Sequence, residues 1–288
     1  MTYNLPCTNH SFSMINLVKL MPSWDWDVFD QILAQTGLSS VELVPSLLLG
    51  PNWDKFPDLV TSDSCYLLEK LTQRYKVGSI QSLTYGLDIN LADDLRSHHG
   101  LARRLEGLVD IGHRTNCFLF ILGSPGQKKQ IFNHINQYNY KSNFIDNCAY
   151  ILSTIGSEFT LSLEHNTSFQ GAEFCNTLGE ISEVVQTLRE RGFSNIGLNL
   201  DTKCLIDEMG PDFNLEQLLA DESLKSLISS IQVGLDFLTR DCSHCKKDKD
   251  ILFSFSRKHR VHLSFEEFGL SESQLLCFTN IWPDEKTS

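Results

Sequence analysis

Three carboxylates each stand directly after a short apolar, strand-like stretch: Glu164, Asp201 and Glu266, with Glu42 ending a fourth stretch in the same way. If such acids meet, their like charges require a cation or a proton. Carboxylates with one or two imidazoles form an oxygen-rich site suited to Mn²⁺, Mg²⁺ or Zn²⁺. Two glutamates across that site could exchange protons with a carbon next to a carbonyl, with the metal stabilising the enediolate. For each acid taken alone, helix capping or solvent exposure is an equally open interpretation.

The elements that would position these acids alternate along the chain. Regular alternation of strand and helix patterns predicts parallel strands with right-handed crossovers, and a count near eight closes a barrel. The expected strands are 13–19, 41–44, 77–83, 117–122, 159–163, 196–200, 227–235 and 261–265, and helical patterns include 26–35, 91–111, 176–191 and 215–228.

The expected fold is therefore α/β, a (β/α)₈ TIM barrel formed as a single domain by residues 1–288. An open doubly wound sheet is the alternative, but no glycine-rich phosphate fingerprint follows the first strand. In a barrel the carboxyl ends of the strands share one mouth, so the strand-end acids would converge there. Residues 133–147, rich in Asn and Tyr, are expected to form a loop or an exposed insertion.

Short motifs occur at strand ends in a fixed order along nearly the whole chain. They include Val41-Glu42-Leu43, Gln81-Ser82-Leu83-Thr84-Tyr85-Gly86, Phe120-Ile121-Leu122-Gly123-Ser124-Pro125, Leu163-Glu164-His165-Asn166, Leu198-Asn199-Leu200-Asp201-Thr202 and Leu263-Ser264-Phe265-Glu266. The ordered set resembles the sugar phosphate isomerase/epimerase group of the xylose-isomerase-like TIM barrels. Each motif is short, and the specificity lies in their order.

This resemblance implies a barrel with one divalent metal held by Glu, Asp, His and Glu. Glu164, Asp201 and Glu266 match three of these ligands, and the two glutamates match the family's acid/base pair. The fourth ligand is missing, because Gly234 stands where the seventh strand should carry a histidine. Neighbouring Gln232 and Asp236 lack the spacing to replace it.

The missing histidine leaves two alternatives for the cofactor. The site could hold Mg²⁺ or Mn²⁺ with water filling the gap, since loss of an imidazole weakens transition-metal binding most, or it could hold no metal. Cys204 stands where relatives with a larger metal cluster have a further histidine. It could bind a soft metal or act as a small buried hydrophobe.

Five further residues are candidates for substrate binding: Gln81, Ser124, His165, Asn166 and Trp24. Ser124 opens a loop whose amides could contact a phosphate, although a tight turn is an equal alternative. His165 could line the pocket, but strand alternation would turn it away from Glu164. Trp24 could form an aromatic wall or pack in the core.

A Cys-x-x-Cys pair, Cys242 and Cys245, has a spacing used for zinc or redox chemistry, but a structural zinc site needs a second pair of ligands nearby. The competing interpretation is a solvated start of a helix. The nine cysteines form no framework pattern and no signal peptide is recognised, which together favour a reducing cytoplasm.

The composition argues against some classes of binding partner. The net charge is −12, from 24 basic and 36 acidic residues, and no basic stretch is interleaved with aromatics, which argues against nucleic-acid binding. No stretch has membrane-spanning length and apolarity. The expected partner is a small carbohydrate-like substrate, and the oligomeric state stays open, with a homodimer as one alternative.

The function that these residues favour is a metal-dependent isomerase or epimerase acting on a sugar or a sugar-like polyol. Glu164 and Glu266 would move the protons. Two alternatives remain: a divergent barrel enzyme of a biosynthetic or modification pathway, and a non-catalytic barrel that binds a ligand or protein after losing its metal.

Overall fold

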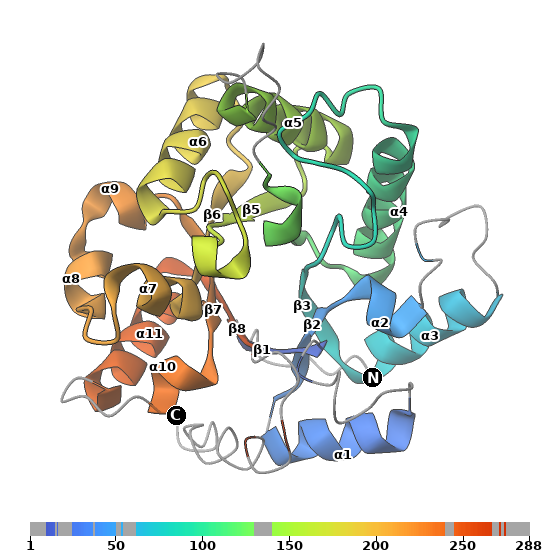
Figure 1. Cartoon of the computed structure of the whole chain (residues 1–288). Helices are drawn as coiled ribbons and strands as arrows, with labels where there is room; N and C mark the ends of the chain where they lie inside the picture. Colours follow the sequence, from blue (N-terminus) through green and yellow to red (C-terminus); the bar gives the residue numbers. More distant parts are fainter. Residues whose placement is uncertain are drawn as a thin grey trace.

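Eight parallel strands close into a barrel in chain order in the computed structural model of this chain, and helices surround them (Figure 1). The structure describes residues 10–14, 16, 25–36, 38–49, 53, 62–129, 140–239, 245–266, 271 and 274. The closed parallel order confirms the predicted (β/α)₈ barrel and excludes the open doubly wound sheet. The strands are β1 His10–Ser13, β2 Ser40–Leu43, β3 Lys76–Ile80, β4 Leu119–Leu122, β5 Thr160–Glu164, β6 Ile196–Asp201, β7 Ile228–Val233 and β8 His262–Phe265.

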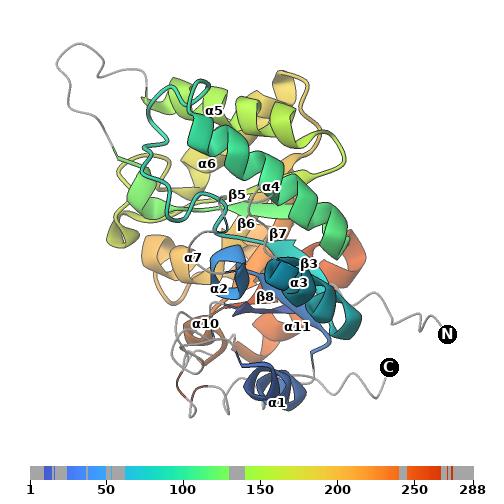
Figure 2. The same cartoon turned by 90° about the vertical axis from the view of Figure 1, so that its right-hand side faces the viewer.

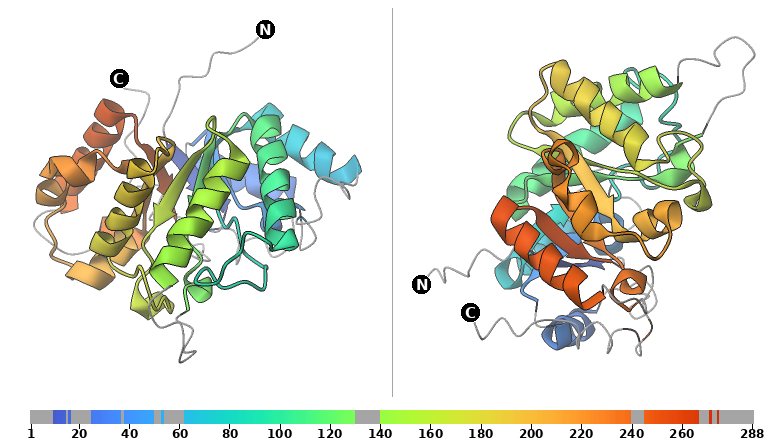
Figure 3. Two further views of the ribbon diagram at one scale, coloured as in Figure 1. Left: turned by 90° about the horizontal axis from the view of Figure 1, so that it is seen from above. Right: turned by 90° about the vertical axis from the view of Figure 1, so that its left-hand side faces the viewer.

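The helices form an outer layer around these strands (Figure 3), and α4 lies between α3 and α5 outside the barrel (Figure 2). No helix among the described residues is both long and apolar enough to cross a membrane. The helices are α1 Trp26–Thr36, α2 Pro45–Leu49, α3 Ser62–Arg74, α4 His99–Thr115, α5 Tyr140–Ile155, α6 Leu178–Glu190, α7 Thr202–Met209, α8 Leu215–Ala220, α9 Glu222–Lys225, α10 Leu235–Thr239 and α11 Cys245–His259, with short 3₁₀ turns η3 Pro125–Gln127 and η4 Ser168–Gln170.

The strands alternate between the two sides of the barrel wall. Apolar residues such as Leu161 and Leu163 are buried against the helices, while Ser162 and Glu164 between and after them face inward. Hydrogen bonds between strands that are not neighbours establish this, since Ser162 Oγ lies 2.8 Å from Ser230 Oγ of β7. The centre of this barrel is therefore polar near its mouth, where many barrels place branched apolar side chains.

One predicted element start is confirmed and another is wrong. Helix α1 begins where expected, because Asp25 Oδ1 accepts hydrogen bonds from the N–H groups of Asp27 and Val28 at 2.9 and 3.2 Å. The first strand was placed too late, since β1 ends at Ser13 rather than beginning there.

The helix expected over 91–111 begins only at His99, because residues 91–95 are held in turns. The buried amide of Asn147 donates to the carbonyls of Leu91 and Asp93 and accepts from the N–H of Leu95. These contacts come from α5, 52 to 56 residues away in the chain. Tertiary hydrogen bonds thus override the local helical pattern.

Two other boundaries also differ from the expectation. The segment expected as a loop over 133–147 turns helical at Tyr140, where α5 begins, and residues 130–139 lie outside the described residues. The pattern over 215–228 is divided into α8 and α9, because Asp221 caps a new helix by accepting from Ser223 and Leu224.

Candidate active site

Glu164, Asp201 and Glu266 line one cavity of about 360 Å³ at the carboxyl end of the strands. They come from β5, β6 and the residue after β8, so the barrel brings together side chains separated by up to 102 positions, from 164 to 266. The other described residues lining the cavity are Gln81, Ser82, Tyr85, Ile121, Gly123, Ser124, Pro125, Asn166, Gln170 and Lys203. The predicted binding residues Gln81, Ser124 and Asn166 are thus at the cavity.

On the β5–β6 side of the cavity, Glu164 is held by one amide. Asn166 Nδ2 donates to Glu164 Oε1 at 2.6 Å. The other oxygen, Oε2, lies beside Gly123, where a Cβ atom would approach it to 2.8 Å. Glycine at this position therefore makes the room that the carboxylate occupies.

A buried lysine fixes the orientation of that amide. Lys128 is 0% exposed, and its Nζ donates to Asn166 Oδ1 at 2.7 Å and to the Glu164 carbonyl at 2.9 Å. An ammonium group has only donors, so Asn166 must turn its oxygen to Lys128 and its NH₂ to Glu164. Burial lowers the pKa of Lys128, and the nearby Glu164 carboxylate opposes that shift. From the sequence, Lys128 is either added charge beside a phosphate at the Ser124 loop or a solvated lysine of a tight turn, and nothing local marks it as buried.

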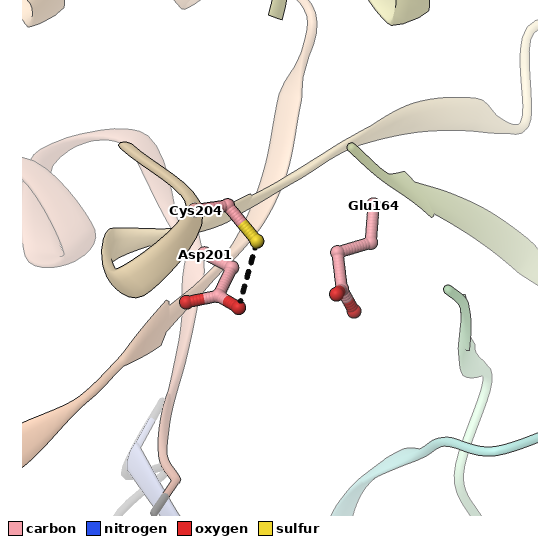
Figure 4. A group of neighbouring side chains, drawn as sticks. All are labelled: Glu164, Asp201 and Cys204. Carbon is pink, nitrogen blue, oxygen red and sulfur yellow. Dashed lines mark hydrogen bonds between the residues drawn. The ribbon is translucent and has the colours of Figure 1, made fainter. Parts of the chain in front are cut away.

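Asp201 both ends β6 and caps α7. Its Oδ1 accepts the N–H of Lys203 at 2.7 Å, and the Cys204 thiol lies 3.2 Å from its Oδ2. The spacing of three residues places Cys204 over Asp201 at the first turn of the helix. One ligand atom from each of Glu164, Asp201 and Cys204 lies within 4.8 Å of the others, the arrangement shown in Figure 4.

On the β2–β8 side, Glu42 and Glu266 share two glutamine amides. Gln81 Nε2 lies 2.7 Å from Glu42 Oε1 and 2.8 Å from Glu266 Oε2. Gln232 Nε2 donates to the same Glu266 oxygen at 2.7 Å, while its own Oε1 accepts from Asn199. Glu42 is fully buried and also accepts from Ser79 at 2.7 Å. Among the described residues, Glu266 Oε1 accepts no hydrogen bond and remains for a ligand.

All four carboxyl groups are shifted toward the protonated form. Loss of hydration, and then the charge of Asp201, raise the pKa of Glu164 to about 8. Burial followed by the charges of Glu42 and Glu164 raises the pKa of Glu266 well above its usual range. Burial is also the main cause of the raised pKa values of Glu42 and Asp201. Carboxyls of this kind can carry protons, or can lose the proton to solvent when a cation binds.

The seventh strand lacks a histidine, and its residues take other roles. Gly234 donates its N–H to Thr202 Oγ1 at 2.9 Å, and Asp236 is exposed on α10. Gln232, considered from sequence only as a replacement ligand, points into the barrel and supports Glu266. The parallel register of β6 and β7 pairs Asp201 with Gln232, so Gln232 lies at the same level of the barrel as the strand-end acids.

Ser124 and His165 are placed differently. Ser124 lines the cavity in a left-handed conformation (φ 63°), and its Oγ lies 2.7 Å from Thr84 Oγ1. His165 is fully buried and is not among the described residues of the cavity wall, because strand alternation turns it outward. Its Nε2 lies 3.4 Å from Glu208 Oε2, and burial lowers its pKa to about 4.

Two sequence candidates cannot be placed at the cavity. Trp24 lies outside the described residues, and its role in binding substrate stays a prediction. Of the Cys242–Cys245 pair, Cys242 is also outside them, and α11 begins at Cys245.

Comparison with known proteins identifies the fold. No family model matches the sequence, and no curated protein matches it either. Among solved structures, a 3-keto-D-glucoside 4-epimerase from E. coli is similar with a TM-score of 0.65 and 11% identity, covering 95% of this chain and 97% of that one. A xylose isomerase domain containing protein from Salmonella typhimurium LT2 is similar with a TM-score of 0.60 and 14% identity, covering 97% of both chains. The chain has the xylose-isomerase-like TIM-barrel fold.

Another barrel of this fold contains zinc. An IOLI protein with a bound zinc atom matches with a TM-score of 0.60 and 14% identity, over 95% of both chains. At such low identity the likeness establishes the xylose-isomerase-like fold, and the chemistry of this chain has to be argued from its own cavity.

Proposed function

We propose that this chain is an isomerase or epimerase of small carbohydrate-like substrates, in which Glu164 and Glu266 move a proton to and from a carbon next to a carbonyl. The observation that carries the proposal is the convergence of Glu164, Asp201 and Glu266 on one cavity of about 360 Å³, within the roughly 300–1,000 Å³ of ligand pockets. The sugar epimerase among its structural neighbours supports the same class of reaction.

In each of the two glutamates, one carboxyl oxygen accepts no hydrogen bond from the described residues and is available to the substrate. Asn166 occupies Oε1 of Glu164, which leaves Oε2 toward Gly123 and the cavity. Gln81 and Gln232 occupy Oε2 of Glu266, which leaves Oε1. We assign proton transfer to Glu164 Oε2 and Glu266 Oε1, because a carboxyl oxygen held by donors is a poorer base than a free one. The pKa of Glu164, raised to about 8, suits it to alternate between acid and base near neutral pH, and burial raises the pKa of Glu266 in the same direction.

The donor set on the β5–β6 side fits a divalent cation. Glu164, Asp201 and Cys204 offer ligand atoms within 4.8 Å of one another, and Gly123 leaves the space beside Glu164 open. When bound, the cation would polarise the substrate carbonyl and stabilise the negative charge that develops on its oxygen. Gln81, Ser124 and Asn166 would then orient the substrate's hydroxyl groups.

A phosphate group on the substrate would meet Lys203 at the rim of the cavity. The Lys203 side chain is exposed at the cavity edge, and among the described residues its ammonium has no hydrogen-bond or ion-pair partner. We propose Lys203 as the contact for the phosphate of a sugar phosphate.

Solvent deuterium incorporation tests this function even when the product is unknown. A panel of ketoses and ketose phosphates is incubated with the protein in D₂O with Mn²⁺ or Zn²⁺, and deuterium next to the carbonyl is measured by mass spectrometry. Wild type should incorporate deuterium into at least one sugar, and Glu164→Gln or Glu266→Gln should each slow it by about 10² or more.

Incorporation that both variants leave undiminished would refute the proposed roles. Tight sugar binding by the wild type without any incorporation would favour the non-catalytic barrel instead.

A further inference from the structure

Cys204 has a position that packing alone does not require. It is 0% exposed, yet its thiol is directed at polar atoms, 3.2 Å from Asp201 Oδ2 and 3.3 Å from Gln170 Oε1. Figure 4 shows the sulfur next to the carboxylate of Asp201, with the Glu164 carboxyl group opposite them. A cysteine that served only as a small hydrophobe would sit among apolar side chains.

The distance between Cys204 Sγ and Asp201 Oδ2 suits a cation bound between them in place of the thiol proton. Sulfur at 2.3 Å and oxygen at 2.0 Å from a tetrahedral zinc ion are about 3.5 Å apart. The observed separation of Cys204 Sγ and Asp201 Oδ2 is 3.2 Å, so a small adjustment admits the ion. Glu164 contributes an oxygen within the same 4.8 Å cluster.

The position that lacks a ligand adjoins the turn that carries this thiol. Gly234 has no side chain, and its N–H is bonded to Thr202 Oγ1 at 2.9 Å. A Cβ atom built at Gly234 would have Thr202 and Lys203 among its nearest neighbours, at 3.8 and 3.9 Å. Gly234, where the resemblance implies a histidine ligand, therefore lies beside the first turn of α7, which carries Cys204.

We propose that Cys204 is a thiolate ligand of the divalent metal, together with Glu164 and Asp201, and that the site consequently selects thiophilic ions such as Zn²⁺ and Co²⁺ over Mg²⁺ and Mn²⁺. Binding breaks the S–H bond, forms a sulfur–metal bond and releases the proton to solvent. Soft thiolate ligands favour zinc-type ions, while sites of oxygen alone suit Mg²⁺ and Mn²⁺. The inference rests on the metal of the proposed function and names its ligand.

Cobalt loading of the full chain tests this directly. Metal-free protein is titrated with Co²⁺ under reducing conditions, and the near-ultraviolet sulfur-to-cobalt charge-transfer band is recorded. The band should appear with saturation in wild type and disappear in Cys204→Ser. Zinc X-ray absorption should show a sulfur neighbour at about 2.3 Å that the same variant lacks. Loss of a residue that only hydrogen-bonds to a metal ligand lowers metal affinity by about 10–100-fold. Loss of the ligand itself in Cys204→Ser should therefore lower Zn²⁺ affinity by at least about a hundredfold.

Two control variants separate this cysteine from the others. Cys117→Ser removes a buried thiol that lines the hollow containing Lys76 and His262, at the opposite end of the barrel, and should keep the band. A Cys242→Ser/Cys245→Ser variant tests the Cys-x-x-Cys motif and should keep it as well.

The outcomes distinguish failure of the thiolate assignment from failure of the proposed metal-assisted function. Cobalt bound at Glu164 and Asp201 without a sulfur band, or a band that survives in Cys204→Ser, overturns the thiolate and leaves the metal-assisted function standing. Failure of wild type to bind Co²⁺ or Zn²⁺ at all overturns both.

Discussion

The two sides of the cavity hold buried carboxyl groups by different means. On the β2–β8 side, Glu42 and Glu266 share the amides of Gln81 and Gln232, which supply hydrogen bonds without any added charge. On the β5–β6 side, Glu164 receives one amide bond. Its neighbour Asp201 receives the backbone N–H groups of Lys203 and Cys204 and the Cys204 thiol.

This difference bears on where the proposed metal would bind. Burial raises the pKa of the carboxyls on both sides, but the offsetting partners differ: a hydrogen bond from Gln81 opposes the shift of Glu266, and the charge of Lys128 opposes that of Glu164. In the proposed function the metal binds on the β5–β6 side, where Glu164, Asp201 and Cys204 offer clustered ligand atoms. The β2–β8 side then presents the free oxygen of Glu266 for proton transfer. The predictions below separate the two sides.

The largest expected effect is on proton transfer, and it distinguishes two glutamates on the same side. Glu266→Gln should slow deuterium incorporation by about 10²–10⁴, because its free oxygen faces the cavity. Glu42→Gln should slow it by less than about tenfold, since Glu42 lies outside the described cavity lining. Equal losses in the two variants, measured at saturating sugar, would show that only the shared hydrogen-bond network matters.

The amide support can be removed without touching the metal side. Gln232→Leu takes a donor from Glu266 and leaves the Asn199 amide without its acceptor, which should lower the free energy of unfolding by about 1–3 kcal/mol in urea titrations. Zinc affinity should stay unchanged. Gln217→Leu on the exposed surface of α8 serves as control and should change stability by less than about 0.5 kcal/mol. A variant as stable as wild type would mean that Glu266 does not depend on this amide.

The metal side can be disturbed by a single methyl group. Gly123→Ala would place a Cβ atom 2.8 Å from Glu164 Oε2 and displace the carboxylate, so Zn²⁺ affinity should fall by about tenfold in calorimetric titrations. Gly126→Ala, three residues later, has no atom within 4 Å of the added methyl and should bind like wild type. Unchanged affinity in both variants would place the ion away from Glu164.

The smallest expected effect is a pH dependence of stability. Because the pKa of Glu164 is raised from 4.5 to about 8 on folding, its contribution is present at low pH and is lost as pH rises toward 8. Metal-free protein should therefore lose stability between about pH 5 and pH 8, and Glu164→Gln should lessen that loss.

The matched control for the pH series is Glu190→Gln, at the exposed end of α6, which should leave the slope as in wild type. A slope that Glu164→Gln does not alter would contradict the assigned protonation. Added Zn²⁺ should also reduce the loss, because the ion replaces the proton as pH rises.

Much of the barrel and part of its site could be predicted from the sequence, because both follow from local pattern. Alternation of strands and helices predicted the closed barrel, and the acids at strand ends predicted that Glu164, Asp201 and Glu266 would share a mouth. Their catalytic and metal-binding roles remain predictions.

What the sequence did not reveal depends on contacts between distant strands and loops. Gln232 reaches Glu266 through the register of β7 with its neighbours, and Lys128 is buried only because its loop folds over Asn166. Likewise, the turns at residues 91–95 depend on Asn147 in α5. No local periodicity encodes such contacts, so the sequence indicated Gln81 and Asn166 as site residues but not the supporting roles of Gln232 and Lys128.

The most direct test of the central claim is metal content by plasma mass spectrometry, on protein purified without chelator or affinity nickel. Wild type, Glu164→Gln/Asp201→Asn and Glu42→Gln are compared after incubation with equal excess Zn²⁺ and Mn²⁺. The account predicts about one divalent ion per chain in wild type and in Glu42→Gln, and none in the double variant. Metal that persists in the double variant, or no metal in any of the three proteins, would contradict it.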